Sequence, residues 1–307
     1  MRFLTLVLST AVMLARGTEV PRYEPSGQQS APTAVPHRII SLVPAVTEML
    51  FAMGDGANVV GVSSYDHYPP QATTRPKVGA LVDPDVERML SLRPDLVIVY
   101  STQTDLIARL ARAHVPMFSY EHAGLPDITA TFRLIGARVG HASEADRLAT
   151  GIEQALAGIR ARVAGKPRPK TLIVIGREEG SLRDIYASAG IGFLHDMLII
   201  AGGDDVLGEL KRQSVQASTE VILTHQPDVI IELRVVDWND VRQQRDLDMW
   251  RALPSLPAVR TNRLFMFGSE MMVIPGPRVA EATRILAKAL HPEAFSQAAE
   301  VRRSPSS

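Results

Sequence analysis

The sequence predicts an α/β protein built as two lobes that one long helix joins. Three observations support this: short apolar runs alternate with helical patterns, one phrase recurs in both halves, and an unusually long helical pattern separates the halves. The chain has 307 residues. At roughly 100–200 residues per domain, this length allows two domains of ordinary size.

Short runs of β-branched and aromatic residues predict the strands. In the first half these runs are RIISL, VVGVS, LVIVY and VPMFSY, and in the second half they are TLIVIG, DVIIEL and RLFMFG. Short apolar runs with helical patterns between them are typical of buried parallel strands linked by crossover helices. Several of the helical patterns start behind Asp, Ser or Thr and several stop at glycine, as capping predicts. The fold class is therefore α/β.

The helix predicted between the halves begins at Ser143, in SEADRLATGIEQALAGIRARVAGKP. Its acidic residues come early, its arginines come late, and Gly165 and Pro167 follow it, so both ends match the capping and dipole preferences of helices. Some 21 residues would extend about 32 Å. We interpret it as a rigid connector between two lobes; the alternative is a long crossover helix within one continuous sheet.

A repeated phrase indicates that the two halves have equivalent structures. The first half has ERMLSLRPDLVI from Glu87 and the second has EVILTHQPDVII from Glu220. Glutamate, proline and aspartate recur at one offset of 133 residues, since 220 − 87, 227 − 94 and 228 − 95 agree. The phrase reads as a helix, a proline after it and an aspartate turn into a buried strand. Two such lobes would enclose a cleft, a favoured position for ligands.

The segments at the two ends differ from the rest of the chain. Arg2 and the apolar run FLTLVLSTAVMLA predict a secretory signal with cleavage near Ala15 to Gly17. The expected organisation is a signal peptide at 1–17, a linker at 18–36, an N-terminal lobe at 37–142, the connecting helix at 143–166, a C-terminal lobe at 167–292 and a disordered tail at 293–307. Because the chain contains no cysteine, we expect a periplasmic protein without a lipid anchor.

Composition and missing motifs exclude several function classes. The 33 Lys and Arg residues balance 33 Asp and Glu residues, so no basic excess suggests a nucleic-acid partner. The sequence lacks the common phosphate-binding, zinc-protease, nucleophile-elbow and dinucleotide motifs. Its eight histidines include no i,i+4 pair; His67, beside Tyr65 and Tyr68, is the one to examine for a metal. We predict a binding protein with no catalytic residues, no cofactor and no metal site of its own.

The assembled phrases resemble a known family. RIISLVPAVTEMLFAMGDGANVVGVSSYDHYPPQA, KVGALVDPDVERMLSLRPDLVIVY, IYASAGIGFLHDMLIIAGGDDV and NRLFMFGS are similar to the helical-backbone periplasmic binding proteins of ABC importers. Within that family the cobalamin-binding branch is the most similar. The resemblance implies two Rossmann-like lobes with parallel central sheets, a rigid connecting helix and a ligand cleft between the lobes. It also implies a monomer that delivers a small molecule to an inner-membrane permease dimer with its ATPase.

The resemblance also implies roles for particular residues. Glu87 and Glu220 match the pair of surface glutamates, one in each lobe, that engage arginines of the permease. The alternative for each is a helix-terminal carboxylate that interacts only with the dipole of its own helix. Because the two glutamates have equivalent positions in the two halves, we expect docking.

A second group of residues is expected to line the cleft. Tyr65, Tyr100 and Tyr186 fall where cobalamin-binding relatives place aromatic contacts, in loops after strands or just before a helix; packing in the core is the alternative. Leu81, the region of Ser214 and Met271 occupy positions where those relatives carry tryptophan. The pocket is therefore expected to be less aromatic and more charged, with Arg234 and Glu270 at it. Arg177, Glu178 and Glu179 either face the cleft or are solvated loop charges.

The ligand and the function class each keep an alternative at this stage. The leading interpretation is a transport binding protein for a cobalt corrinoid, with a ferric siderophore or haem as the other ligand. Haem-binding relatives have a tyrosine just before the repeated phrase, where this sequence has Ala80 and Leu81. A siderophore would favour basic residues at the cleft. The alternative from another class is a secreted enzyme or a sensor domain on the same scaffold.

Overall fold

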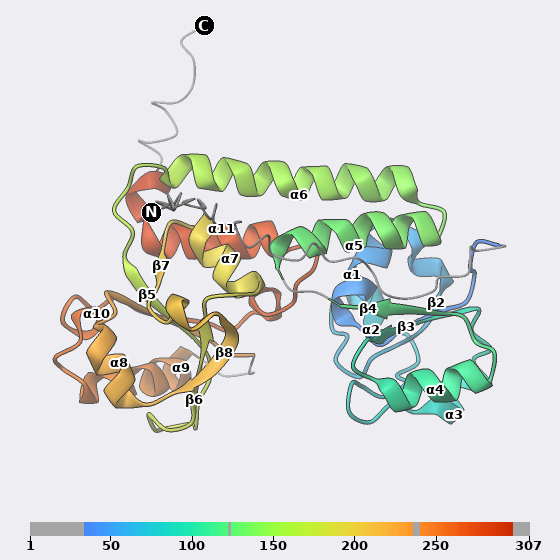
Figure 1. Ribbon diagram of the computed structural model, residues 1–307, viewed down its shortest axis with the longest axis horizontal. Coiled ribbons are helices and arrows are strands. Elements are labelled where there is room, and N and C mark those ends of the chain that lie inside the picture. The colour runs from blue at the N-terminus through green and yellow to red at the C-terminus, as the bar shows by residue number, and fades with distance from the viewer. Residues whose placement is uncertain (1–33, 122–123, 236–239, 297–307) are drawn as a thin grey trace, which may run out of the picture. The chain divides into compact units, whose positions relative to one another are not determined.

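The N-terminal lobe is built on a four-stranded parallel sheet (Figure 1). The computed structural model describes residues 34–121, 124–235 and 240–296. The strands are β1 (Ile39–Ser41), β2 (Val59–Val62), β3 (Leu96–Tyr100) and β4 (Met117–Tyr120), in the order β2-β1-β3-β4. All three pairings are parallel. The strands predicted for the first half are therefore confirmed, including their burial.

Helices connect these strands, as parallel pairing requires. They are α1 (Pro44–Ala52), α2 (Pro70–Thr73), α3 (Val86–Ser91) and α4 (Thr104–Arg112), with a short 3-10 helix, η1 (Asp55–Asn58). After the last strand, α5 (Leu125–Arg138) leads to the next helix. Gly54 follows α1 with a φ of +86°. Glycine suits that left-handed position because it has no Cβ.

The predicted connecting helix is α6 (Ala142–Val163), which has 22 residues. It starts one residue before Ser143 and ends before Gly165, which has a φ of +75°. In Figure 1 it runs alongside α5 of the first lobe and α11 (Val279–Leu290) of the second. Its buried side chains recur at helical spacing along one face: Ala145, Ala149, Ile152, Leu156, Ile159 and Val163. The helix therefore packs against both lobes.

The C-terminal lobe contains a mixed sheet, which corrects the expectation of parallel sheets in both lobes. Strands β5 (Lys170–Gly176), β7 (Asp204–Asp205), β9 (Val229–Leu233) and β10 (Leu264–Phe267) pair in parallel. Strands β6 (Ile185–Ala189) and β8 (Arg212–Ala217) pair antiparallel to their neighbours, and the sheet order is β10-β9-β5-β6-β8. The segment between β5 and β6 is too short for a crossover helix, so the chain folds back on itself.

The remaining elements of this lobe cover the sheet and complete its loops. The helices are α7 (Phe193–Ile200), α8 (Thr219–His225), α9 (Asp240–Leu247), α10 (Pro257–Arg260) and α11. Short 3-10 helices occur at η2 (Gly208–Leu210), η3 (Asp248–Ala252), η4 (Glu270–Met272) and η5 (Pro292–Phe295).

The repeated phrase has the same local structure in both lobes. Asp85 and Ser218 cap α3 and α8, each accepting from the backbone amide three residues on, at 2.9 and 3.3 Å. Arg93 and Gln226 then adopt left-handed φ values of 49° and 50° before the prolines. These positions also differ by 133 residues, so the structural repeat includes positions at which the two residue types differ.

The aspartate of each phrase joins two neighbouring strands. Asp95 accepts from the amides of His37 and Arg38, both at 2.8 Å, and Asp228 accepts from the amide of Lys170 at 3.0 Å. Each carboxylate therefore ties the start of the following strand to the start of the central strand beside it.

One apolar cluster extends through both lobes. It includes Ile39 of β1, Ile159 of α6 and Ile231 of β9, all nearly inaccessible to solvent. Two smaller clusters lie on the other faces of the sheets, one in each lobe. The predicted signal peptide, most of the linker and most of the tail lie outside the described residues. No helix in the described ranges is long and apolar enough to cross a membrane.

Candidate functional site

Two of the three residues expected to bind ligand in the first lobe lie at the carboxyl ends of its strands. Tyr65 follows β2, Leu81 lies in the turn before α3, and Tyr100 ends β3. Tyr65 and Leu81 are exposed, at 64% and 45% of their full surface. The carboxyl ends of parallel strands are where α/β sheets bind ligands, so these positions suit a binding site.

Tyr100 is held in place by its neighbours. Its ring contacts that of Tyr120 edge to face, with centroids 5.8 Å apart. Burial, followed by the charge of Asp66, raises the pKa of Tyr100 to about 12. The buried Gln103 accepts from the Tyr100 amide at 3.0 Å and donates to the Leu81 carbonyl at 3.0 Å. This glutamine, which sequence reasoning missed, therefore links two of the expected ligand contacts.

The loop after β2 is fixed by Asp66, a second residue that sequence reasoning missed. Its Oδ2 accepts from the Ser63 amide at 2.6 Å, and its carbonyl accepts from Lys77 at 2.7 Å. The other carboxyl oxygen is buried and has no hydrogen-bond partner among the described residues. Burial raises the pKa of Asp66 to about 7. The loop that carries Tyr65 and His67 is thus anchored inside the first lobe.

Two side-chain contacts connect this part of the first lobe to the second. His67 Nδ1 is hydrogen-bonded to a carboxylate oxygen of Glu270, in η4 after β10. Arg278, before α11, forms a two-pronged ion pair with the buried Glu48 of α1, at 2.9 and 2.6 Å. The Arg278 guanidinium also lies over the Tyr68 ring, 3.9 Å from its centroid. Glu270 and the adjoining Met271 are therefore brought next to the loop that carries Tyr65.

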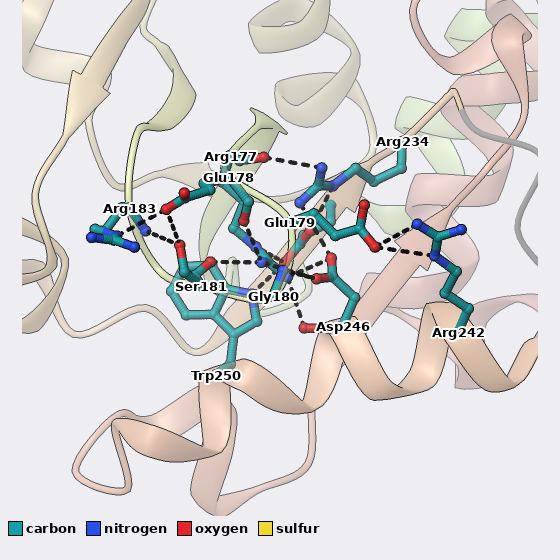
Figure 2. Close-up of polar contacts among 11 residues, drawn as sticks. Arg177, Glu178, Glu179, Gly180, Ser181, Arg183, Arg234, Arg242, Asp246 and Trp250 are labelled. Carbon is teal, nitrogen blue, oxygen red and sulfur yellow. Dashed lines mark hydrogen bonds and ion pairs between the residues drawn. The ribbon is translucent and has the colours of Figure 1, made fainter.

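A buried charge network occupies the strand ends of the second lobe (Figure 2). Arg177, after β5, donates through Nε to Glu232 of β9 at 2.9 Å and through Nη2 to Asp246 of α9 at 2.9 Å. Its side chain is completely buried. Trp250 donates to the same Glu232 oxygen at 2.5 Å. Arg177 therefore neither faces a cleft nor is a solvated loop charge, because it is the centre of this network.

Arg234 belongs to the same network. It donates to Glu232 and Asp246, both at 3.2 Å, and to the Arg177 carbonyl at 3.1 Å. Its side chain is 12% exposed. The structure therefore gives Arg234 a structural task, and its contact with ligand stays a prediction.

The other charged residues expected near this region are paired at the surface. Glu178 accepts from Arg183 at 2.8 Å and from the Ser181 hydroxyl at 2.7 Å. Glu179 accepts from Arg242 at 3.1 Å. Figure 2 shows these pairs flanking the buried network on both sides. In each pair one cation meets one anion, so these four surface charges balance one another.

Tyr186 lies in β6, and not in a loop as expected. Its ring is 47% exposed because the position faces away from the apolar cluster of that lobe. Cavities of about 540 and 470 Å³ occur elsewhere, beside Tyr68 and Arg278 and beside Leu125 and His195. Neither cavity is lined by the residues expected to bind ligand. The assignment of those residues to a ligand site therefore depends on their positions in the fold and not on a cavity.

The two expected docking glutamates are exposed and equivalent. Glu87 and Glu220 are each the second residue of their helix, α3 and α8. Within the described ranges, neither carboxylate forms an ion pair. The Ser218 hydroxyl, with a smaller effect of the local backbone, lowers the pKa of Glu220. Both positions are thus accessible to an external cation.

Sequence and structure comparisons find related proteins over most of the chain. A family model described as periplasmic binding protein matches residues 39–271. An uncharacterized ABC transporter substrate-binding lipoprotein of Bacillus subtilis is 28% identical over 85% of this chain and 82% of its own length. A vitamin B12-binding protein of Pectobacterium atrosepticum is 25% identical over 91% of this chain and 94% of its own length.

Solved structures of similar proteins have the same fold. A periplasmic heme-binding protein from Roseiflexus sp. RS-1 has a TM-score of 0.72 and 26% identity, over 84% of this chain and 99% of its own. The periplasmic vitamin B12-binding protein of Vibrio cholerae has a TM-score of 0.70 and 24% identity, over 85% of this chain and 99% of its own. The two-lobed architecture is therefore shared with proteins that are named for different metal-containing ligands.

Proposed function

Because this chain belongs to the periplasmic binding protein family of ABC transporters, we propose that it captures a cobalt corrinoid between its lobes and delivers it to a membrane permease. The family consists of substrate-binding transport proteins, which work with a permease and an ATPase. The seven proposed ligand contacts are Tyr65, Leu81, Tyr100, Tyr186, Arg234, Glu270 and Met271. Of these, Tyr65 and Tyr186 offer exposed, flat aromatic faces to a large planar ligand.

The observation that carries the choice of ligand is the pairing of charges in the second lobe. Arg177 and Arg234 are offset by Glu232 and Asp246, and Glu178 and Glu179 are offset by Arg183 and Arg242. An anionic ferric siderophore, or the propionates of haem, would be favoured by uncompensated arginines. A neutral corrinoid needs none, and similarity to vitamin B12-binding proteins supports the same choice.

Haem is the second candidate ligand. The 26% identity to a heme-binding protein of known structure favours it. Against it, Leu81 occupies the position where haem-binding relatives would offer a tyrosine. A haem complex would also have to place two carboxylates beside a surface whose arginines are already paired.

We propose that Glu87 and Glu220 are the docking residues for the permease. Both carboxylates are exposed at the start of equivalent helices, and the lowered pKa of Glu220 favours its ionised form. An arginine on each permease subunit could then pair with one lobe. Such exposed pairs steer encounter and fix orientation more than they add affinity.

The docking variant Glu87→Arg with Glu220→Arg tests this function. Uptake of labelled cyanocobalamin by cells that carry the chain and its permease should be lost, because two attractive contacts become repulsive. The dissociation constant of the purified variant for cyanocobalamin should stay within about twofold of that of the unaltered chain. The control is Asp105→Arg with Glu281→Arg, which reverses two exposed first-turn carboxylates on α4 and α11. If the control loses uptake equally, the docking assignment is wrong.

A further inference from the structure

His67 is presented in a way that suits coordination of a chelated metal. Its ring is held at one nitrogen by Glu270, while 57% of its side chain stays exposed. Glu270 itself is 25% exposed. Among the described residues, no hydrogen-bond partner occurs for the other nitrogen, Nε2. The imidazole therefore has one nitrogen occupied and one available.

The contact with Glu270 determines which nitrogen carries the proton. An ionised carboxylate can only accept hydrogen bonds, so Nδ1 must be the donor. In the neutral ring, Nε2 then carries a lone pair. A carboxylate behind a metal-binding histidine orients the ring and raises the basicity of the opposite nitrogen.

The backbone that carries His67 is fixed before any ligand arrives. The preceding residue, Asp66, is buried and holds the loop through the Ser63 amide and Lys77. Tyr65 of the same loop and Met271 beside Glu270 are both proposed ligand contacts. His67 is thus a preorganised donor at the proposed binding site.

The surroundings fit a chelated metal and not a free ion. In the described part of the chain there is no group of three or more His, Asp or Glu side chains that could hold a metal ion. A metal inside a macrocycle already has its equatorial positions filled, so it needs only one further donor. Imidazole is a suitable donor for cobalt and for iron.

We propose that His67 Nε2 is an axial ligand to the metal of the transported chelate. This inference rests on the proposed function. With a corrinoid that carries exchangeable water on cobalt, the cobalt–oxygen bond breaks, a cobalt–nitrogen bond forms and the water leaves. The oxidation state of cobalt does not change, and no other reactant is needed.

Two corrinoids and one variant test the inference. Aquacobalamin has an exchangeable water, whereas the cyanide of cyanocobalamin is not displaced by imidazole. Binding of aquacobalamin to the unaltered chain should shift its visible spectrum to that of an imidazole complex. In His67→Ala the shift should be absent and the affinity for aquacobalamin should fall roughly tenfold. The affinity for cyanocobalamin should change by no more than about threefold.

Two further variants separate coordination from general damage to the site. His37→Ala removes an exposed imidazole just before β1. His37 lies at the amino end of that strand, whereas the proposed site is at the carboxyl ends, so this variant should retain the spectral shift. Glu270→Gln removes the charged acceptor but keeps a side chain of similar shape. Because Glu270 is also a proposed ligand contact, the test is the difference between the two corrinoids: the affinity for aquacobalamin should fall about tenfold more than the affinity for cyanocobalamin.

The possible failures can be told apart. If the unaltered chain binds neither corrinoid, the corrinoid function is wrong and this inference fails with it. If both corrinoids bind but the aquacobalamin spectrum is the same with the unaltered chain and with His67→Ala, only the axial ligand is wrong. An equal loss of affinity for both corrinoids in His67→Ala would also overturn the axial-ligand inference, because it would indicate that His67 only packs against the ligand.

Discussion

Arg177 shows how one buried side chain can hold the loop between β5 and β6 in place. Its guanidinium contacts carboxylates from β9 and α9 and also the carbonyls of Glu178 and Ser181. Gly180 in turn donates to Asp246 at 2.8 Å. The loop between β5 and β6 is therefore held to the rest of the lobe by one connected set of hydrogen bonds.

Replacing Arg177 by methionine should destabilise the protein strongly. Glu232 and Asp246 would remain buried with less than their full set of partners, and breaking a buried pair costs about 3–5 kcal/mol. The free energy of unfolding from denaturant titration measures this. Arg183→Met is the matched control, because its pair with Glu178 is exposed and contributes little to stability in water. Similar losses for both variants would contradict a special role for the network.

Asp66 should give the stability a distinct pH dependence. Burial raises its pKa from 3.8 to about 7. The folded state therefore binds more protons than the unfolded state between these values. Its contribution to stability is complete below about pH 4 and is lost as the pH rises through about 7.

The variant Asp66→Asn isolates this contribution because it removes the titrating group. Between about pH 4 and 7, the free energy of unfolding of the unaltered chain should fall progressively relative to that of the variant. Outside that window the difference between the two free energies should stay constant. Profiles that stay parallel throughout would show that Asp66 has an ordinary pKa.

At the level of single residues, the sequence indicated positions but not pairings. Tyr65 and Glu270 could be placed near strand ends by pattern, and Leu81 and Met271 could be placed at the site only by resemblance. Arg177 could not be assigned as buried, because its partners Glu232 and Asp246 lie 55 and 69 residues away. One usable signal was present: the glutamate in DVIIEL interrupts an apolar strand, and a buried charge needs a partner.

The elements were predicted best where local chemistry decides them. The repeated phrase combines a helix cap, a left-handed residue, a proline and an aspartate, and each acts within a few residues. The antiparallel strands β6 and β8 were missed because IYASA contains few large aliphatic residues and RQSVQA is mostly polar and exposed. Such strands lack the continuous apolar run that marked the parallel ones.

Two glycines within α6 test whether the exposed face of this helix is free of packing contacts. A Cβ at Gly151 or Gly158 would meet no atom of the described residues within 4 Å, so alanine can be added there without collision with them. Each substitution should stabilise the protein by about 0.5–1 kcal/mol, because alanine loses less conformational freedom in a helix. The unfolding midpoint should rise in each variant and further in the double variant.

Gly136 of α5 provides the opposite result within the neighbouring helix. A Cβ there would lie 2.2 Å from the Cβ of Ala145 in α6. Gly136→Ala should therefore destabilise the protein by about 1–3 kcal/mol, the usual cost of overpacking. A stabilising effect at Gly136, or a destabilising effect at Gly151, would contradict the packing described for these two helices.

At the scale of the whole molecule, contacts between the lobes accompany the shared apolar cluster. Glu48 and Arg278 pair across the lobes, and Asp196 of α7 accepts from the Leu125 amide of α5 at 2.9 Å. The sequence predicted two lobes and a connector from the repeat and the long helix. It could not predict these contacts, because the partners lie 230 and 71 residues apart.

Calorimetric titration of the purified chain with cyanocobalamin tests the central claim most directly. The proposed function predicts one site per chain, with a dissociation constant in the micromolar range or tighter. The same protein should bind ferric haem more weakly, because its arginines are already paired. No detectable heat with cyanocobalamin at high micromolar protein, together with saturable binding of haem, would contradict the corrinoid assignment.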